Sequence, residues 1–254
     1  YRMPLPLPVG EYRIAAWAGV SDDFEMPELV AGKSTLEDLM VRMKRKESLV
    51  HNKALNPLWY GGVQAVSFTG RQEQTETVSL IKDTNKFRFI LQKSGPGEEL
   101  DINDCLFEIR ADNGYYDWNN DLLDDDMISY RPYYLEKVED VGIVVEMNTM
   151  RLMAGRNYRL IIRHHGWEKD VLNVNLNDYL LLTKMEGHRI SPQEYLDRQD
   201  EYSIIFFLTP KVCPDCPDKP TPPDPPGPDN PDNPDNPDGP NPEDPTIVGY
   251  ACFK

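Results

Sequence analysis

The sequence predicts an all-β protein of the sandwich type with two short helices, and two patterns carry this prediction. In the segment 86–91, Phe87, Phe89 and Leu91 fall on one face of a strand, and Lys86 and Arg88 fall on the other. The stretch 172–177 alternates Leu and Val with Asn, which is the clearest period-two pattern in the chain. One apolar and one polar face are typical of antiparallel sandwiches and not of parallel sheets buried on both faces.

Further strands are expected in short runs rich in β-branched and aromatic residues. These runs are 9–19, 58–68, 78–80, 106–111, 142–147, 158–164 and 202–208.

Two helices are predicted from their capping patterns. The segment 34–37 (Ser-Thr-Leu-Glu) matches a capping box, and apolar residues follow at helical spacing as far as Met43. The segment 191–194 (Ser-Pro-Gln-Glu) places Pro192 at the first position of a second helix, of about two turns.

Composition divides the chain into three parts. A polar, aperiodic stretch at 71–76 indicates a border between an N-terminal β-sandwich domain (1–74), whose opening strands we expect to be missing, and a C-terminal one (75–209). From Pro210 onward a tail (210–254) is rich in Pro, Asp and Asn, with 14 Pro in the last 44 residues. Regularly spaced proline removes backbone donors, so an extended acidic segment is expected there.

The chain is acidic, with 27 Lys and Arg against 43 Asp and Glu and a net charge of −16 over 254 residues. Such a surface repels the phosphates of nucleic acids and anionic lipid headgroups, so we expect neither as a partner. No apolar run approaches the ~20 residues of a membrane helix. No signal peptide is visible, and the chain is interpreted as a fragment or processed form.

The four cysteines do not indicate a disulfide scaffold. Cys105 stands alone in the body, and the other three lie in the tail. Cys213 and Cys216 form a CxxC pair, which supplies two of the four ligands that zinc requires and has no helix to activate a redox thiol. A local disulfide, or no role, is the favoured interpretation.

The acidic run 117–126 invites a calcium interpretation. Asp117, Asn119 and Asp121 match the first ligand positions of an EF-hand loop, but Leu122 stands where glycine is required. A solvated loop is therefore favoured over a looser calcium loop.

Other chemical motifs are weak or absent. His164 and His165 are adjacent in a strand and point to opposite faces, so they are interpreted as a surface pair. The Gly-x-Ser-x-Gly nucleophile motif does not occur in the sequence. The four Trp residues suit a core or domain interface better than a sugar-binding platform. We therefore expect no enzyme, with no catalytic residue, no cofactor and no metal.

Six segments in order resemble the anchor-type subunits of Bacteroidetes (type V) fimbriae. The resemblance spans roughly residues 9–208 and rests on the segments 9–19, 58–61, 82–85, 111–117, 128–133 and 194–202.

The resemblance implies two consecutive transthyretin-like β-sandwich domains and no catalytic residues. It also implies a structural protein of the cell surface, exported to the outer membrane and held there by a lipid anchor upstream of this chain. Its partners would be other fimbrial subunits. A surface glycan-binding β-sandwich lipoprotein is the alternative function.

Members of this family usually continue after the strand at 202–208 into a final strand, whereas here Pro210 begins the tail. We therefore hypothesise that the apolar end of the tail, at 246–253, fills an open groove in its own domain or is donated to a neighbouring subunit. The candidate subunit-contact residues are Ile247, Val248, Tyr250 and Phe253.

Overall fold

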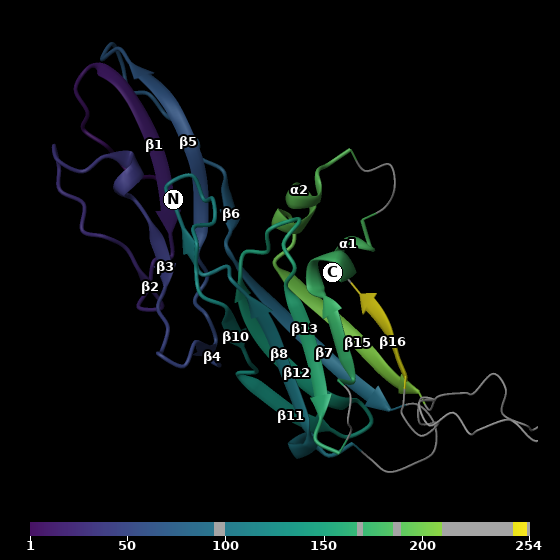
Figure 1. The fold of residues 1–254 in the computed structure, drawn as a ribbon. Helices are drawn as coiled ribbons and strands as arrows, with labels where there is room; N and C mark the ends of the chain where they lie inside the picture. The colour runs from purple at the N-terminus through teal and green to yellow at the C-terminus, as the bar shows by residue number, and fades with distance from the viewer. Residues whose placement is uncertain (94–99, 167–169, 185–188, 210–245, 253–254) are drawn as a thin grey trace, which may run out of the picture.

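The computed structural model describes residues 1–93, 100–166, 170–184 and 189–209 and, for their backbone, residues 246–252. The fold is mostly β-sheet with two short α-helices, as the sequence predicts (Figure 1). The tail between residues 210 and 245 lies outside the described residues, as do Cys213 and Cys216.

A sandwich of two five-stranded sheets forms the larger unit. The first sheet has the order β14 (Leu172–Asn175), β13 (Arg159–His164), β8 (Cys105–Ala111), β10 (Ile128–Tyr130) and β4 (Val50–His51). The second has the order β11 (Tyr134–Val138), β12 (Gly142–Met150), β7 (Thr84–Lys93), β15 (Glu201–Thr209) and β16 (Thr246–Cys252).

One face of β7 lies in the core of this sandwich, and the other face is exposed. Phe87, Phe89 and Leu91 are at most 1% exposed, whereas the Arg88 side chain between them is 52% exposed. Aromatic stacking continues the core onto the neighbouring strand β15, because the Phe87 ring lies 4.9 Å from the Tyr202 ring. The period-two pattern therefore predicted the buried face of the central strand correctly.

Two three-stranded sheets form the smaller unit, which projects from the sandwich (Figure 1). One has the order β1 (Gly10–Ala18), β5 (Trp59–Phe68) and β6 (Leu80–Lys82), and the other has β2 (Phe24–Glu25), β3 (Val41–Met43) and β9 (Tyr115–Tyr116). The structure also has two short 3-10 helices, η1 (Leu36–Asp38) between β2 and β3 and η2 (Ile102–Asp104) directly before β8.

Within each unit, strand pairing connects segments from both sides of the expected border near residue 74. β3 pairs with β9, and β4 pairs with β10, although β3 and β4 precede residue 74 and their partners follow it. The limits 1–74, 75–209 and 210–254 remain a prediction.

Two pairings are parallel, unlike the antiparallel neighbours predicted from the alternation pattern. β15 lies parallel to β7 from Glu201 to Leu208, and β4 lies parallel to β10. Both join segments that are remote in sequence, so the alternation of apolar residues, which reports only the buried face, carries no information about strand direction.

The helix expected after residue 34 is wrong beyond its first turn. Thr35 caps a single 3-10 turn with Asp38, and residues 41–43 form β3 instead. Val41 and Met43 are fully buried on one face of that strand, and β2 and β9 pair with its two edges. Tertiary pairing therefore overrides the helical spacing of these residues.

The helix predicted at residue 191 is confirmed as α2 (Pro192–Asp197). The Ser191 hydroxyl accepts a hydrogen bond from the Glu194 backbone N–H at 3.1 Å. A second helix, α1 (Leu176–Leu181), begins where the alternation pattern predicted a continuing strand. The Asn175 side chain caps it, and Leu176 and Leu180 enter the core.

The central position of Phe89 gives a test of this core. Phe89→Ala should lower the free energy of unfolding by about 3–5 kcal/mol, because it leaves a cavity between the Phe87 and Phe206 rings. Arg88→Ala, on the outer face of the same strand, should change it by less than about 1 kcal/mol. Urea unfolding followed by circular dichroism measures both, and equal losses would contradict the assignment of faces.

Candidate functional site

The predicted contact segment forms the edge strand β16 beside β15. In the register of this antiparallel pair, Ile247 lies opposite Leu208, Val248 opposite Phe207 and Tyr250 opposite Ile205. Phe253 lies outside the described residues.

β15 presents one edge to β7 and the other to β16. Its alternate residues fill the core, with Ile204, Phe206 and Leu208 at most 2% exposed. The strand that lies along its outer edge therefore completes a sheet whose inner face is already apolar. An edge of this kind accepts any extended segment that offers backbone hydrogen bonds.

A buried polar cluster lies where the two units meet, and we name it the junction network: Asp83, Asn113, Tyr116, Asn120, Tyr130, Arg151 and Asp197. Its members come from the turn between β6 and β7, the loops flanking β9, strand β10, the end of β12 and helix α2. Four of the six segments that resemble fimbrial anchors contribute to it, namely 82–85, 111–117, 128–133 and 194–202.

Asn113 holds the centre of the junction network. Its side-chain amide donates to the carbonyls of Met150 and Arg151 at 3.0 and 2.9 Å, and its side-chain oxygen accepts from the Tyr130 hydroxyl at 2.8 Å. The Tyr116 hydroxyl donates to the Asn113 carbonyl at 2.8 Å. These bonds tie the turn after β8 to the end of β12.

Arg151 links the network to α2. Its guanidinium forms two hydrogen bonds of 2.7 Å with the Asp197 carboxylate and donates to the Asn120 carbonyl at 3.1 Å. This is the bidentate geometry in which a planar guanidinium faces a planar carboxylate. No local pattern in the sequence indicates this pair, because the two residues are remote along the chain.

Asp83 is fully buried in the network. One carboxylate oxygen accepts from the Asn120 amide at 3.0 Å and lies 3.9 Å from Arg151 Nε, and the other has no hydrogen-bond partner. Burial raises the pKa of Asp83 to about 7, against the opposing effects of Asn120 and Arg151.

A second ionic cluster, the arginine clamp, consists of Arg42, Arg45 and Asp125. Asp125 has no exposed side-chain area and accepts from Arg45 Nη2 at 2.5 Å and from Arg42 Nη2 at 3.1 Å. The clamp connects β3 and the loop after it to the loop before β10.

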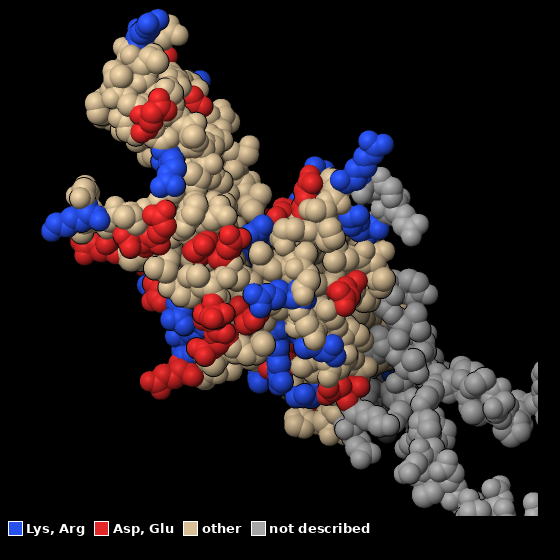
Figure 2. All heavy atoms as spheres, turned by 45° about the horizontal axis from the view of Figure 1, so that its top comes forward, with Lys and Arg blue, Asp and Glu red and all other residues tan. Residues whose placement is uncertain are grey.

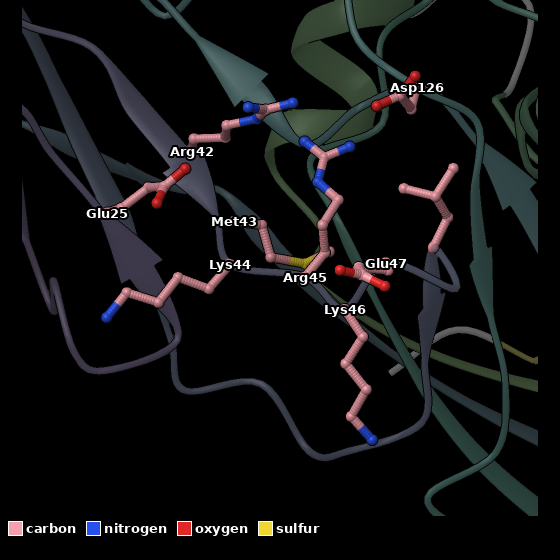
Figure 3. A pocket seen from close by; sticks show the side chains of 9 residues that line it. Glu25, Arg42, Met43, Lys44, Arg45, Lys46, Glu47 and Asp126 are labelled. Carbon is pink, nitrogen blue, oxygen red and sulfur yellow. The ribbon is translucent and has the colours of Figure 1, made fainter.

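An open pocket of about 680 Å³ lies beside the arginine clamp. In Figure 3 the guanidinium groups of Arg42 and Arg45 lie toward Asp126, and the side chains of Lys44 and Lys46 extend on the other side. Its lining is Glu25, Arg42, Met43, Lys44, Arg45, Lys46, Glu47, Leu49 and Asp126. On the face drawn in Figure 2, basic and acidic side chains are interspersed despite the negative net charge.

The other motifs weighed in the sequence form no chemical site in the described part of the chain. The Asp117 carboxylate accepts from the backbone N–H groups of Asn119 and Asp121, so it stabilises its own loop. Within the described residues, no group of three or more His, Cys, Asp or Glu side chains is placed to hold a metal ion. Burial raises the pKa of the Cys105 thiol to about 11, which makes it a poor nucleophile.

The sequence model of the fimbrillin-A associated anchor proteins Mfa1 and Mfa2 matches residues 1–221. The chain belongs to this family. It is a family of fimbrial anchor proteins associated with the cell surface and not an enzyme family. The fold with its buried junction network is therefore that of a structural protein.

A curated relative in this fimbrial anchor family is the minor fimbrium anchoring subunit Mfa2 of Porphyromonas gingivalis. It is 20% identical over 172 residues, which are 66% of this chain and 51% of the relative. The chain thus spans about half the length of that protein.

Solved structures share the fold. One from Bacteroides thetaiotaomicron VPI-5482, provisionally described as polysaccharide binding proteins, is 47% identical with a TM-score of 0.75, covering 81% of this chain and 72% of that chain. One from Bacteroides ovatus, provisionally described as an adhesin, is 32% identical with a TM-score of 0.71, covering 81% and 70%. The fimbrial anchor protein Mfa2 from Porphyromonas gingivalis is 18% identical with a TM-score of 0.61, covering 82% and 72%, which shows the fold alone.

None of the helices in the described part of this fimbrial anchor family member is long and apolar enough to span a membrane.

Asp83 makes the stability of the junction network dependent on pH. Because its pKa is higher in the folded than in the unfolded protein, its contribution to stability is complete at low pH and decreases as the pH rises through about 7. Asp83→Asn should therefore gain stability relative to wild type between pH 5 and pH 8, by on the order of 2 kcal/mol.

Urea unfolding at pH 5, 6, 7 and 8 measures this difference. The matched control is Asp22→Asn, at an exposed position outside the network, and its difference from wild type should stay constant. A pH-independent difference for Asp83→Asn would show that Asp83 is ionised throughout this range.

Proposed function

We propose that the chain is a fimbrial anchor or accessory subunit that holds a fimbria to the outer membrane through strand pairing with other fimbrial subunits. The observation that supports this mechanism is β16, which pairs with β15 from Thr246 to Cys252 although residues 210–245 separate the two strands in sequence. Membership of the fimbrial anchor family supports the fimbrial part of the proposal.

The mechanism follows from the way in which β16 is connected. A strand at the end of a long proline-rich connector reaches the same edge of β15 in its own copy or in a neighbour, and the backbone hydrogen bonds are alike in both cases. The entropic cost of a longer connector grows only slowly with its length. Ile247, Val248, Tyr250 and Phe253 are the proposed contact residues of such an exchange.

Anchoring to the outer membrane is a further part of the proposal. The proposed anchor is a lipid attached upstream of residue 1, as the resemblance to fimbrial anchor subunits implies. The proposal places the two units between this lipid and the fimbria.

Glycan binding is the alternative, because a relative 47% identical to this chain is provisionally described as polysaccharide binding. A sugar platform would need exposed coplanar rings. In the described residues the stacked rings of Phe87, Phe89 and Tyr202 are all buried, and Trp17 is tilted by 55° against the buried Tyr60 ring. These rings therefore form no aromatic platform for a polysaccharide in the described residues, and the fimbrial function is favoured over binding of that kind.

Deleting residues 246–254 tests the strand-pairing mechanism. We expect cells with this variant to release most of their fimbriae into the medium, because β15 loses its edge partner. A deletion of equal length within the connector, residues 230–238, keeps β16 and should retain the fimbriae. Quantifying fimbriae in the cell and medium fractions measures both, and equal retention would overturn the mechanism.

Immunogold electron microscopy tests the position of the protein. Label at the bases of fimbriae, with sheared fibres nearly free of it, is expected for an anchor. Label along shafts or at tips would make the protein a structural or adhesive subunit. Label unrelated to any fibre would contradict the fimbrial function and favour glycan binding.

A further inference from the structure

We infer that the pocket beside the arginine clamp binds a hydroxylated carboxylate of the hexuronic acid class. It is lined by four cationic side chains, Arg42, Lys44, Arg45 and Lys46, in a protein whose net charge is −16. Three acidic side chains, Glu25, Glu47 and Asp126, share this lining, and the pocket is independent of β16 and of strand pairing.

The first argument is the uncompensated charge of the clamp. Two guanidinium groups share the single carboxylate of Asp125, so the clamp retains one excess positive charge. The Arg45 side chain is only 8% exposed, and its Nε and Nη1 have no hydrogen-bond partner, nor does Nε of Arg42. A buried guanidinium that lacks partners favours an anion beside it.

The second argument is the accessible part of the lining. The Arg42 side chain is 38% exposed and presents its guanidinium to the pocket from above the Tyr115 ring. Lys44 and Lys46 are exposed, and neither forms an ion pair within the described residues. The two ammonium groups and Nη1 of Arg42 are available to a ligand carboxylate, because Nη2 of Arg42 donates to Asp125 and its Nε is buried.

The third argument concerns the acidic side chains of the same lining. Glu25, Glu47 and Asp126 would repel a simple anion such as sulfate. Sugar hydroxyls donate hydrogen bonds to carboxylates and accept them from ammonium groups. A ligand with one carboxylate and several hydroxyls therefore satisfies both signs of charge, and a volume of about 680 Å³ is in the range of small-ligand sites.

The backbone of the pocket is fixed in an unusual conformation. Leu49, a lining residue, has a φ of 54°, in the left-handed region that non-glycine residues rarely adopt. Its carbonyl accepts from the Ser129 N–H at 2.9 Å, and its N–H donates to the Lys46 carbonyl at 3.0 Å. The first hydrogen bond attaches Leu49 to the larger sandwich, and the second closes the turn from Lys46 to Leu49. Together they hold the backbone that carries the basic side chains.

Isothermal titration calorimetry of the full chain with sodium glucuronate tests the inference. Glucuronate should bind saturably and at least about tenfold more tightly than acetate or glucose, because only glucuronate offers both the carboxylate and the hydroxyls. No saturable binding, or an equal response to acetate, sulfate or glucose, would overturn it.

Variants assign the binding to this pocket. Arg42→Gln and Lys46→Gln should each weaken glucuronate binding by about fivefold or more, since each removes one accessible cation. Lys46→Gln breaks no contact in the described structure, so it stays informative if Arg42→Gln fails to fold. Lys33→Gln, at an exposed position outside the lining, is the matched control and should bind as wild type. Equal affinity of all three variants would overturn the assignment.

Acidic variants separate a sugar site from a plain anion site. At least one of Glu25→Ala, Glu47→Ala and Asp126→Ala should weaken glucuronate binding while strengthening acetate binding. If all three strengthen both ligands, the pocket attracts anions without recognising hydroxyls. The deletion of residues 246–254 should leave glucuronate binding unchanged, so failure of the strand-pairing mechanism is distinguishable from failure of this inference.

Discussion

The outer edge of β15 is the constraint on which the larger sandwich depends. β15 lies parallel to β7 and fills the core with Ile204, Phe206 and Leu208, so it cannot be a short or charged edge of the kind that natural sheets use to avoid unwanted pairing. The backbone N–H and C=O groups along this edge need a partner. The chain supplies one from beyond residue 245, and the proposed contact between subunits is based on this remote origin.

The junction network explains how the smaller unit is held against this sandwich. The smaller unit joins it through Tyr116 of β9, whose hydroxyl donates to the Asn113 carbonyl, and through Asn120 after β9, whose carbonyl accepts from Arg151. A network of this kind is stable only when nearly all its members are satisfied. Asp83 and Asn120 each keep one side-chain oxygen without a partner, and Asp83 makes the junction sensitive to pH.

Charge is distributed in a way that net composition conceals. The sequence is strongly acidic, yet the arginine clamp gathers two guanidinium groups around Asp125 and places them beside further lysines. Because interactions between charges weaken over about 8 Å at physiological salt, these cations act on a ligand largely independently of the distant acidic residues. A surface protein can thus be anionic overall and still hold an anionic sugar at one place.

The sequence by itself determined the features that local patterns report. Period-two alternation placed Phe87, Phe89 and Leu91 in the core, and the Ser191–Pro192 pair located the start of α2, because both depend on neighbours a few residues away. Only the tertiary structure decided that residues 41–43 form a strand, that β15 runs parallel to β7, and that Arg42 and Arg45 converge on Asp125. These features depend on contacts between segments remote in sequence, which no local periodicity encodes.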